Sequence, residues 1–187
     1  MGTGPSPRPN EVGRRQRRFV RFLGAMATDP LADLQLQALT GEPRTVAAWV
    51  TTFHLGVVAL DPFTYESAWL IEEAGRILDG FTAADVRVGW LVMGTADEAR
   101  QFLGPWADKL LTFIDPERKA VGAMGLEALP AFVHVDSAAQ VASKAEGWDP
   151  PQWKVAVNEL AKVLSWSAPA IPGPHAPGPY PGTPARG

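Results

Sequence analysis

Apolar residues recur at two spacings between residues 45 and 165, and the alternation of these spacings predicts an α/β protein. Glu66 to Leu78 gathers its apolar side chains on one helical face and most of its charged ones on the other. A second amphipathic stripe, Trp153 to Leu164, follows the helix-start sequence Asp149-Pro150-Pro151. Short runs rich in valine and aromatic residues predict buried strands between the helices. These runs are 45–60 (one long or two short strands), 86–93, 110–114, 132–135 and, pairing beside the last, 141–144.

Weaker signals complete the order of elements. Thr95 is placed to cap a helix over 96–103, and a short helix is expected over 117–124. In residues 11–42 the spacing of the aromatic and apolar residues predicts a helical extension, with a second helix starting at Asp29-Pro30 and stopping at Gly41. The alternation Leu34-Gln-Leu36-Gln leaves a strand open instead.

Both ends of the chain are poor in apolar side chains. Residues 1–10 are expected to be disordered. The same expectation holds for the proline- and glycine-rich residues 166–187, where only Ile171 and Tyr180 could enter a core. This tail is either inert or a proline-rich docking motif. Residues 43–165 are therefore predicted to form the folded domain.

The 187 residues carry a net charge of −3, but the charge is unevenly distributed. Residues 1–21 contain six arginines and one glutamate, whereas the rest of the chain has a net charge of −8. A net negative charge of this size in residues 22–187 argues against general nucleic-acid binding, because the phosphate backbone is also negative. The arm could contact an anionic surface, or lie on a membrane as a basic amphipathic helix. Its contact residues would be Arg14, Arg15, Arg17, Arg18 and Arg21.

No apolar run reaches the roughly 18 residues of a membrane span. We expect a cytoplasmic protein, with membrane association through the arm left open. The chain contains no cysteine, which excludes disulfides, thiolate metal sites and iron–sulfur clusters. His54, His134, Asp61 and Asp136 lack metal-ligand spacing, and no glycine-rich phosphate loop is present. We therefore expect neither a metal nor a cofactor.

The strand-to-helix turn at residues 57–67 resembles the turn that carries the redox cysteines of thioredoxin-like proteins. Where a thioredoxin has Trp-Cys-Gly-Pro-Cys, this chain has Phe63-Thr64-Tyr65-Glu66-Ser67. Where a peroxiredoxin has Thr-x-x-Cys, it has Thr64 and Ser67 at the first and last positions. Both alignments place Ser67 on a reactive cysteine.

Two further segments extend the resemblance over residues 54–165, roughly 60% of the chain. The sequence from Val121 to Asp136 is similar to the family segment that contains a cis-proline, which the resemblance places at Leu129–Pro130. Ala131 departs from the threonine that often follows that proline. Phe113-Ile-Asp115-Pro116-Glu117-Arg118 is similar to the aspartate-proline turn of peroxiredoxins. The resemblance implies a thioredoxin-like fold of the redoxin and peroxiredoxin branch, a central mixed sheet flanked by helices.

Oxygen cannot perform the thiol chemistry of that family. Thiol–disulfide exchange and thiol peroxidase activity are excluded for this chain acting alone. No histidine has a motif that would make Ser67 a nucleophile. The simplest role of Asp61, Thr64 and Ser67 is to cap the helix.

The resemblance also implies a function, because redox relatives dock an extended peptide beside the cis-proline. We therefore expect a non-catalytic module that binds a protein partner, with homo-oligomers left open. An enzyme using hydroxyl groups and a peripheral membrane or assembly factor are the alternatives. The expected groove consists of Phe63, Thr64, Tyr65, Glu66, Ser67, Leu129 and Pro130.

Overall fold

The computed structural model describes residues 30–187. Its helices are α1 (Val46–Trp49), α2 (Tyr65–Asp79), α3 (Ala96–Leu103), α4 (Trp106–Lys109), α5 (Lys119–Ala123) and α6 (Pro150–Val163). Its strands are β1 (Gln35–Ala38), β2 (Arg44–Thr45), β3 (His54–Leu60), β4 (Val86–Val92), β5 (Leu111–Ile114), β6 (Ala128–Leu129), β7 (Ala131–Val135), β8 (Val141–Glu146) and β9 (Thr183–Pro184).

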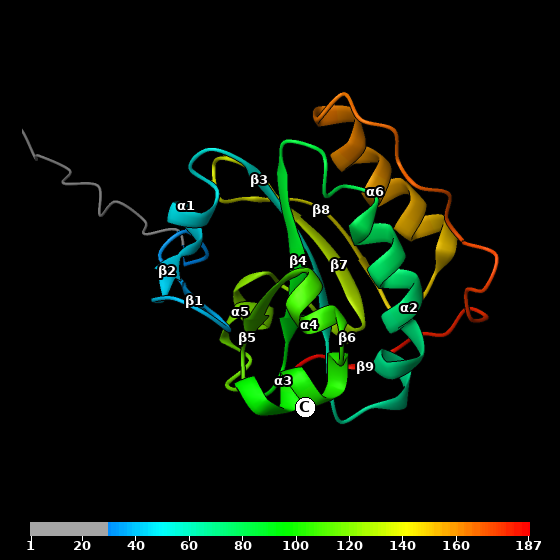
Figure 1. The fold of residues 1–187 in the computed structure, drawn as a ribbon, viewed down its shortest axis with the longest axis horizontal. Coiled ribbons are helices and arrows are strands. Elements are labelled where there is room, and N and C mark those ends of the chain that lie inside the picture. Colours follow the sequence, from blue (N-terminus) through cyan, green and yellow to red (C-terminus); the bar gives the residue numbers. More distant parts are fainter. Residues whose placement is uncertain (1–29) are drawn as a thin grey trace, which may run out of the picture.

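Seven strands form one mixed sheet in the order β2-β1-β5-β4-β3-β7-β8 (Figure 1). β3, β4 and β5 run parallel because helices cross over between them, whereas β7 pairs antiparallel to β3 and β8 antiparallel to β7. The two remaining strands, β6 and β9, make a small separate ladder. This arrangement confirms the predicted α/β fold with a central mixed sheet.

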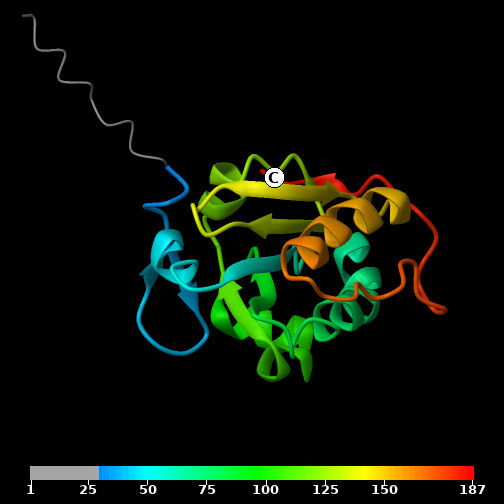
Figure 2. The same cartoon turned by 90° about the horizontal axis from the view of Figure 1, so that it is seen from above.

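Helices cover both faces of the sheet, and each face has its own core. α2 and α6 lie side by side on one face (Figures 1 and 2). The apolar stripe of α2 packs on β3 and β4, and that of α6 on β7 and β8, in one core around Trp90, Trp148 and Trp153. α1 and α5 contribute to the core of the other face around Phe113. Because β3 and β4 are buried on both faces, their sequences read as continuous apolar runs rather than as alternating patterns.

Local signals set the starts of α3 and α6 where they were predicted. Asp149 accepts a hydrogen bond from the Gln152 backbone N–H at the start of α6. At the start of α3, the Thr95 hydroxyl accepts from the Glu98 N–H while the Glu98 carboxylate accepts from the Thr95 N–H. This reciprocal capping box satisfies two donors that the first turn would otherwise leave free.

Thr95→Ala is expected to lower the free energy of unfolding by about 1 kcal/mol, because it removes the hydroxyl half of the capping box. Urea denaturation measures the change. Thr95→Ser keeps an acceptor at the same place and should stay within about 0.5 kcal/mol of the parent chain. Equal losses in the two variants would contradict a capping role.

Two predictions near the amino end need correction. The second helix expected up to Gly41 is not formed by residues 30–41, because residues 35–38 form β1, which pairs with β5 and with β2; the strand alternative was correct. For residues 45–60 one long strand is wrong and two strands are found: β2 ends at Thr45, β3 begins at His54, and the unpredicted short helix α1, capped by Thr45, lies between them. The predicted disorder of 1–10, the helix of the arm and its five arginines lie outside the described residues. Within residues 30–187, no helix is both long and apolar enough to cross a membrane.

The expectation of a disordered tail is also wrong. After α6 the chain runs along the outside of α2 and α6 and ends in β9 beside β6 (Figures 1 and 2). Ile171 is buried in the core of the α2 face, and Ala185 is buried on the other face. Hydrogen bonds to the rest of the chain fix the backbone between them, and local composition does not reveal such distant partners.

Candidate functional site

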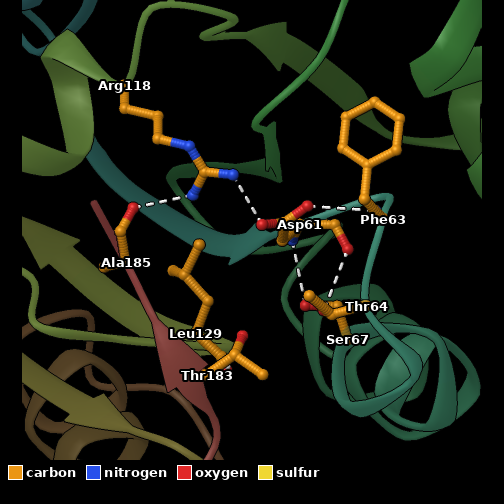
Figure 3. Close-up of polar contacts among 8 residues, drawn as sticks. All are labelled: Asp61, Phe63, Thr64, Ser67, Arg118, Leu129, Thr183 and Ala185. Carbon is orange, nitrogen blue, oxygen red and sulfur yellow. Dashed lines mark hydrogen bonds and ion pairs between the residues drawn. The ribbon is translucent and has the colours of Figure 1, made fainter. Parts of the chain in front are cut away.

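The site lies where β3 ends and α2 begins. Asp61 follows the last residue of β3, and one of its carboxylate oxygens accepts a hydrogen bond from the Phe63 N–H at 3.0 Å. The Ser67 hydroxyl accepts from the Asp61 N–H at 2.9 Å (Figure 3). Both side chains are buried. The oxygen at the second cysteine position therefore holds the turn together.

The expectation that Asp61, Thr64 and Ser67 cap the helix is wrong. Thr64 occupies the N-cap position of α2, but its side chain accepts no hydrogen bond from the first turn. Its hydroxyl instead donates to the Asp61 carbonyl oxygen at 3.2 Å. Asp61 and Ser67 likewise bond within the turn rather than to the free N–H groups of the helix. These oxygens stabilise the turn and leave α2 without a side-chain cap.

The structure brings the predicted cis-proline next to this turn. The Leu129–Pro130 peptide bond is cis. β7 pairs with β3 so that Ala131 lies opposite Ala59. Continuing the antiparallel register places Pro130 and Leu129 beside the end of β3, where the turn starts. The turn and the cis-proline are thus neighbours, as the resemblance implied.

An ion pair connects the turn to the end of the chain. The Arg118 guanidinium donates to the Asp61 carboxylate at 2.6 Å and to the Ala185 carbonyl oxygen at 2.8 Å (Figure 3). The side chains of Asp61 and Arg118 are 7% and 22% exposed. Because both charges are largely removed from water, each depends on the other.

The short strand β6 is held from the β8 side by a carboxylate. Glu146 accepts hydrogen bonds from the backbone N–H groups of Glu127 and Ala128, at 2.7 and 2.8 Å, and pairs with Lys144. Burial alone would raise the pKa of Glu146, but Lys144 and the two N–H donors hold it below its usual range. Glu146 therefore stays charged and fixes the strand that precedes the cis-proline.

The other side of β6 is occupied by the chain itself. β9 pairs antiparallel with β6, and Thr183 lies opposite Leu129 (Figure 3). The Ala185 N–H donates to the Glu127 carbonyl oxygen at 2.8 Å. An extended segment thus takes the place beside the cis-proline where, by the resemblance, a peptide would dock.

Three aromatic side chains project from the start of α2. We name Phe63, Tyr65 and Trp69 the aromatic rim; they are 68%, 78% and 57% exposed. Tyr65 stacks on Trp69, and the Trp69 ring meets the Tyr180 ring edge-on at 5.7 Å. So exposed a set of large rings is typical of an interaction surface.

Hydrogen bonds and burial fix Tyr180, which lies in the tail. Its hydroxyl donates to the Glu66 carbonyl oxygen at 2.5 Å. Burial, with a contribution from the Glu66 charge, raises the pKa of Tyr180 well above its usual value, so the hydroxyl keeps its proton. The backbone of Tyr180 exchanges two hydrogen bonds with that of Trp148, and the Trp148 indole donates to the Pro177 carbonyl oxygen at 2.8 Å.

Ser67 is poorly placed for catalysis. Its side chain is inaccessible and its oxygen is already used by Asp61. His54 and His134 hydrogen bond to each other at 2.7 Å. His54 begins β3 and Ser67 follows its far end, so the two lie about 20 Å apart, given about 3.3 Å per strand residue. Neither histidine is therefore positioned to act as its base.

Sequence reasoning found the turn and the cis-proline but missed several residues that complete the site. Arg118 appeared only as the end of the aspartate-proline segment, and Tyr180 only as an isolated apolar residue in the tail. A charged residue next to a turn was a sequence signal that could have identified Arg118. No sequence signal indicated the roles of Trp148 and Ala185. Among residues 30–187, no three or more histidine or acidic side chains gather as a metal site.

Neither a family model nor a curated protein matches the sequence. Solved structures do resemble the fold. The exposed lipoprotein thioredoxin Etrx1 of Streptococcus pneumoniae is 16% identical with a TM-score of 0.55, over 71% of this chain and 100% of that one. A secreted disulfide oxidoreductase of Mycobacterium tuberculosis is 13% identical with a TM-score of 0.53, over 71% and 99%. The Xanthomonas campestris bacterioferritin comigratory protein, studied for alkyl peroxide reduction, is 14% identical with a TM-score of 0.54, over 73% and 92%.

The chain has a thioredoxin-like fold. Its structural neighbours are redoxins of both the thiol-oxidoreductase and the peroxiredoxin-like kind, as the turn and the cis-proline implied. It differs from the pattern of that fold in having Thr64 and Ser67 at the two cysteine positions and no cysteine elsewhere.

Proposed function

We propose that this protein is a non-catalytic thioredoxin-fold module that binds a protein partner beside cis-Pro130. The observation that carries the proposal is the β6–β9 ladder. Position 67 holds an inaccessible oxygen in place of sulfur, yet the backbone next to the cis-proline still pairs with an extended segment. These contacts support the docking of an extended peptide without redox chemistry.

The aromatic rim extends this docking surface toward solvent. Large, rigid rings supply much of the binding energy at protein interfaces. The rim lies against Tyr180 and thus next to the segment that already occupies the β6 edge. We infer that a partner contacts the rim and the β6 edge together.

Replacing Phe63 and Tyr65 by alanine is expected to weaken partner binding by about tenfold or more, because each ring is an exposed anchor that does not hold the tail. The measurement is quantitative co-purification from the native host, comparing the parent chain with Phe63→Ala/Tyr65→Ala. Both side chains are exposed, so circular dichroism should show an unchanged fold.

Val155→Ala/Val163→Ala is the matched control, because these side chains on α6 are 65% and 56% exposed. Partners lost only from the rim variant would support the proposal. Partners kept by both variants, or lost equally from both, would remove it. A hydroxyl-dependent enzyme and recruitment through the basic arm stay predictions without a supporting contact in the described residues.

A further inference from the structure

We propose that residues 177–185 are a built-in ligand of the groove beside cis-Pro130, and that the groove selects partner peptides by the pattern of this segment. The pattern is a tyrosine, a glycine two residues later and a small residue three residues after that, with the two residues between the glycine and the small residue in a strand. A partner peptide carrying it would replace the tail. The inference rests on the proposed function and specifies its ligand and its regulation.

The segment after α6 has two parts that are held differently. Ile171 is buried in the core, and the Gly173 N–H donates to the buried carboxylate of Glu73 at 2.8 Å. Beyond Gly173, Ala185 is the buried side chain and Ala176 and Tyr180 are partly buried, and hydrogen bonds make the remaining contacts. A segment that buries little apolar surface can open without unfolding the core. The first part is thus an anchor and the second part can exchange.

Three positions of the exchangeable part are recognised. The Tyr180 hydroxyl donates a hydrogen bond to the Glu66 carbonyl oxygen, and its ring makes an edge-to-face contact with Trp69. Ala185 is fully buried, and its carbonyl oxygen accepts a hydrogen bond from the Arg118 guanidinium. The groove therefore selects a tyrosine at position 180 and a small residue at position 185 by shape and by hydrogen bonding.

Gly182 is the third recognised position. It has φ +83°, and a Cβ built on it would lie 2.5 Å from the Leu129 carbonyl oxygen. Both facts exclude other side chains while β9 is paired with β6. On the other side of the contact, the backbone of Gly147 lies equally close to the tail. A Cβ built on Gly147 would lie 2.5 Å from the Pro181 carbonyl oxygen.

The tail is covalently attached to the domain, so its effective concentration at the groove determines how strongly it competes with an external peptide. A short tether gives an effective concentration of about 1 mM. For the tail to occupy the groove nine-tenths of the time, its intrinsic dissociation constant must be about 0.1 mM or lower. The same occupancy weakens the binding of an external peptide by about tenfold.

The test uses the full chain with Gly182→Val, which expels β9, and with Tyr180→Ala as a second releasing variant. Gly178→Val is the matched control, because a Cβ at Gly178 meets nothing within 4 Å. The probe is a fluorescently labelled synthetic peptide of residues 176–187, followed by anisotropy. Hydrogen exchange of the Trp148 amide reports whether the tail has left, because its N–H donates to the Tyr180 carbonyl oxygen.

We expect the peptide to bind both releasing variants at about 0.1 mM or tighter, and the parent chain and Gly178→Val at least about tenfold more weakly. A peptide carrying Gly182→Val should not bind. Equal binding to all chains, or no binding at 1 mM to a variant whose Trp148 amide exchanges faster, would overturn the inference.

Failure here and failure of the proposed function give different results. If the peptide does not bind while the rim variant still loses its partners, the specificity is wrong and the binding role stands. If the peptide binds as expected but the rim variant keeps all its partners, the tail is a ligand of the groove and the proposed use of the rim is wrong.

Discussion

Replacing Arg118 by alanine is expected to lower the free energy of unfolding by about 3 kcal/mol, because it leaves a buried carboxylate without its partner. Asp61 is 7% exposed, and the 2.6 Å contact with Arg118 is its ion pair. The same substitution removes the donor to the Ala185 carbonyl oxygen and so loosens the tail. Chemical denaturation measures the loss, and hydrogen exchange in β6 should rise with it.

Asp61→Asn in the Arg118→Ala background separates charge from packing. A neutral amide no longer needs a cation, so the double variant should be more stable than Arg118→Ala alone. A double-mutant cycle of these chains gives the coupling between the two side chains. Simple additivity, or a loss below about 1 kcal/mol for Arg118→Ala, would show that the pair does not organise the site.

Acidification from pH 7 to below 4 is expected to remove about 3 kcal/mol of stability through His134. Burial, followed by the nearby His54, lowers the pKa of His134 from 6.5 to about 4, while Asp136 opposes the shift. The unfolded chain therefore takes up a proton at a higher pH than the folded chain. Stability contributed by the neutral ring is complete above pH 6.5 and is lost as the pH falls to about 4.

His134→Gln isolates this effect, because it leaves no titrating ring in β7. The difference in unfolding free energy between parent and variant should shrink by about 3 kcal/mol between pH 7 and pH 4. A constant difference would mean that the buried ring binds its proton without penalty. The tautomer with the proton on His134 Nε2 explains the pair best, since its unpartnered buried Nδ1 is then a lone pair rather than an N–H donor.

Most of the central fold could be predicted because its signals are local. Each signal involves residues within about one helical turn of each other. The signals are the apolar stripe of α2, the capping box at Thr95 and the cap at Asp149 that starts α6. Pro130 was harder: its cis bond followed from the resemblance alone, since the local sequence favours trans. The strand β1 was left open because four alternating residues fit two structures equally well.

The tail could not be predicted because its partners are remote in sequence. A segment rich in proline and glycine buries little, and composition alone then favours disorder. What holds it are the Glu66 carbonyl oxygen, the Trp148 backbone and Arg118, which lie 32 or more residues away along the chain. Thr64 was misjudged for a different reason, since its hydroxyl donates to the Asp61 carbonyl oxygen within the turn and does not accept from the helix.

The contact between Trp69 and Tyr180 gives the molecule an optical reporter of its own. The two rings lie 5.7 Å apart, and the Trp148 indole is tied to the tail at Pro177. Departure of the segment alters the surroundings of both indoles, whereas the buried Trp90 and Trp153 remain in the core. Native emission spectra can therefore follow ligand exchange in real time, with no dye attached.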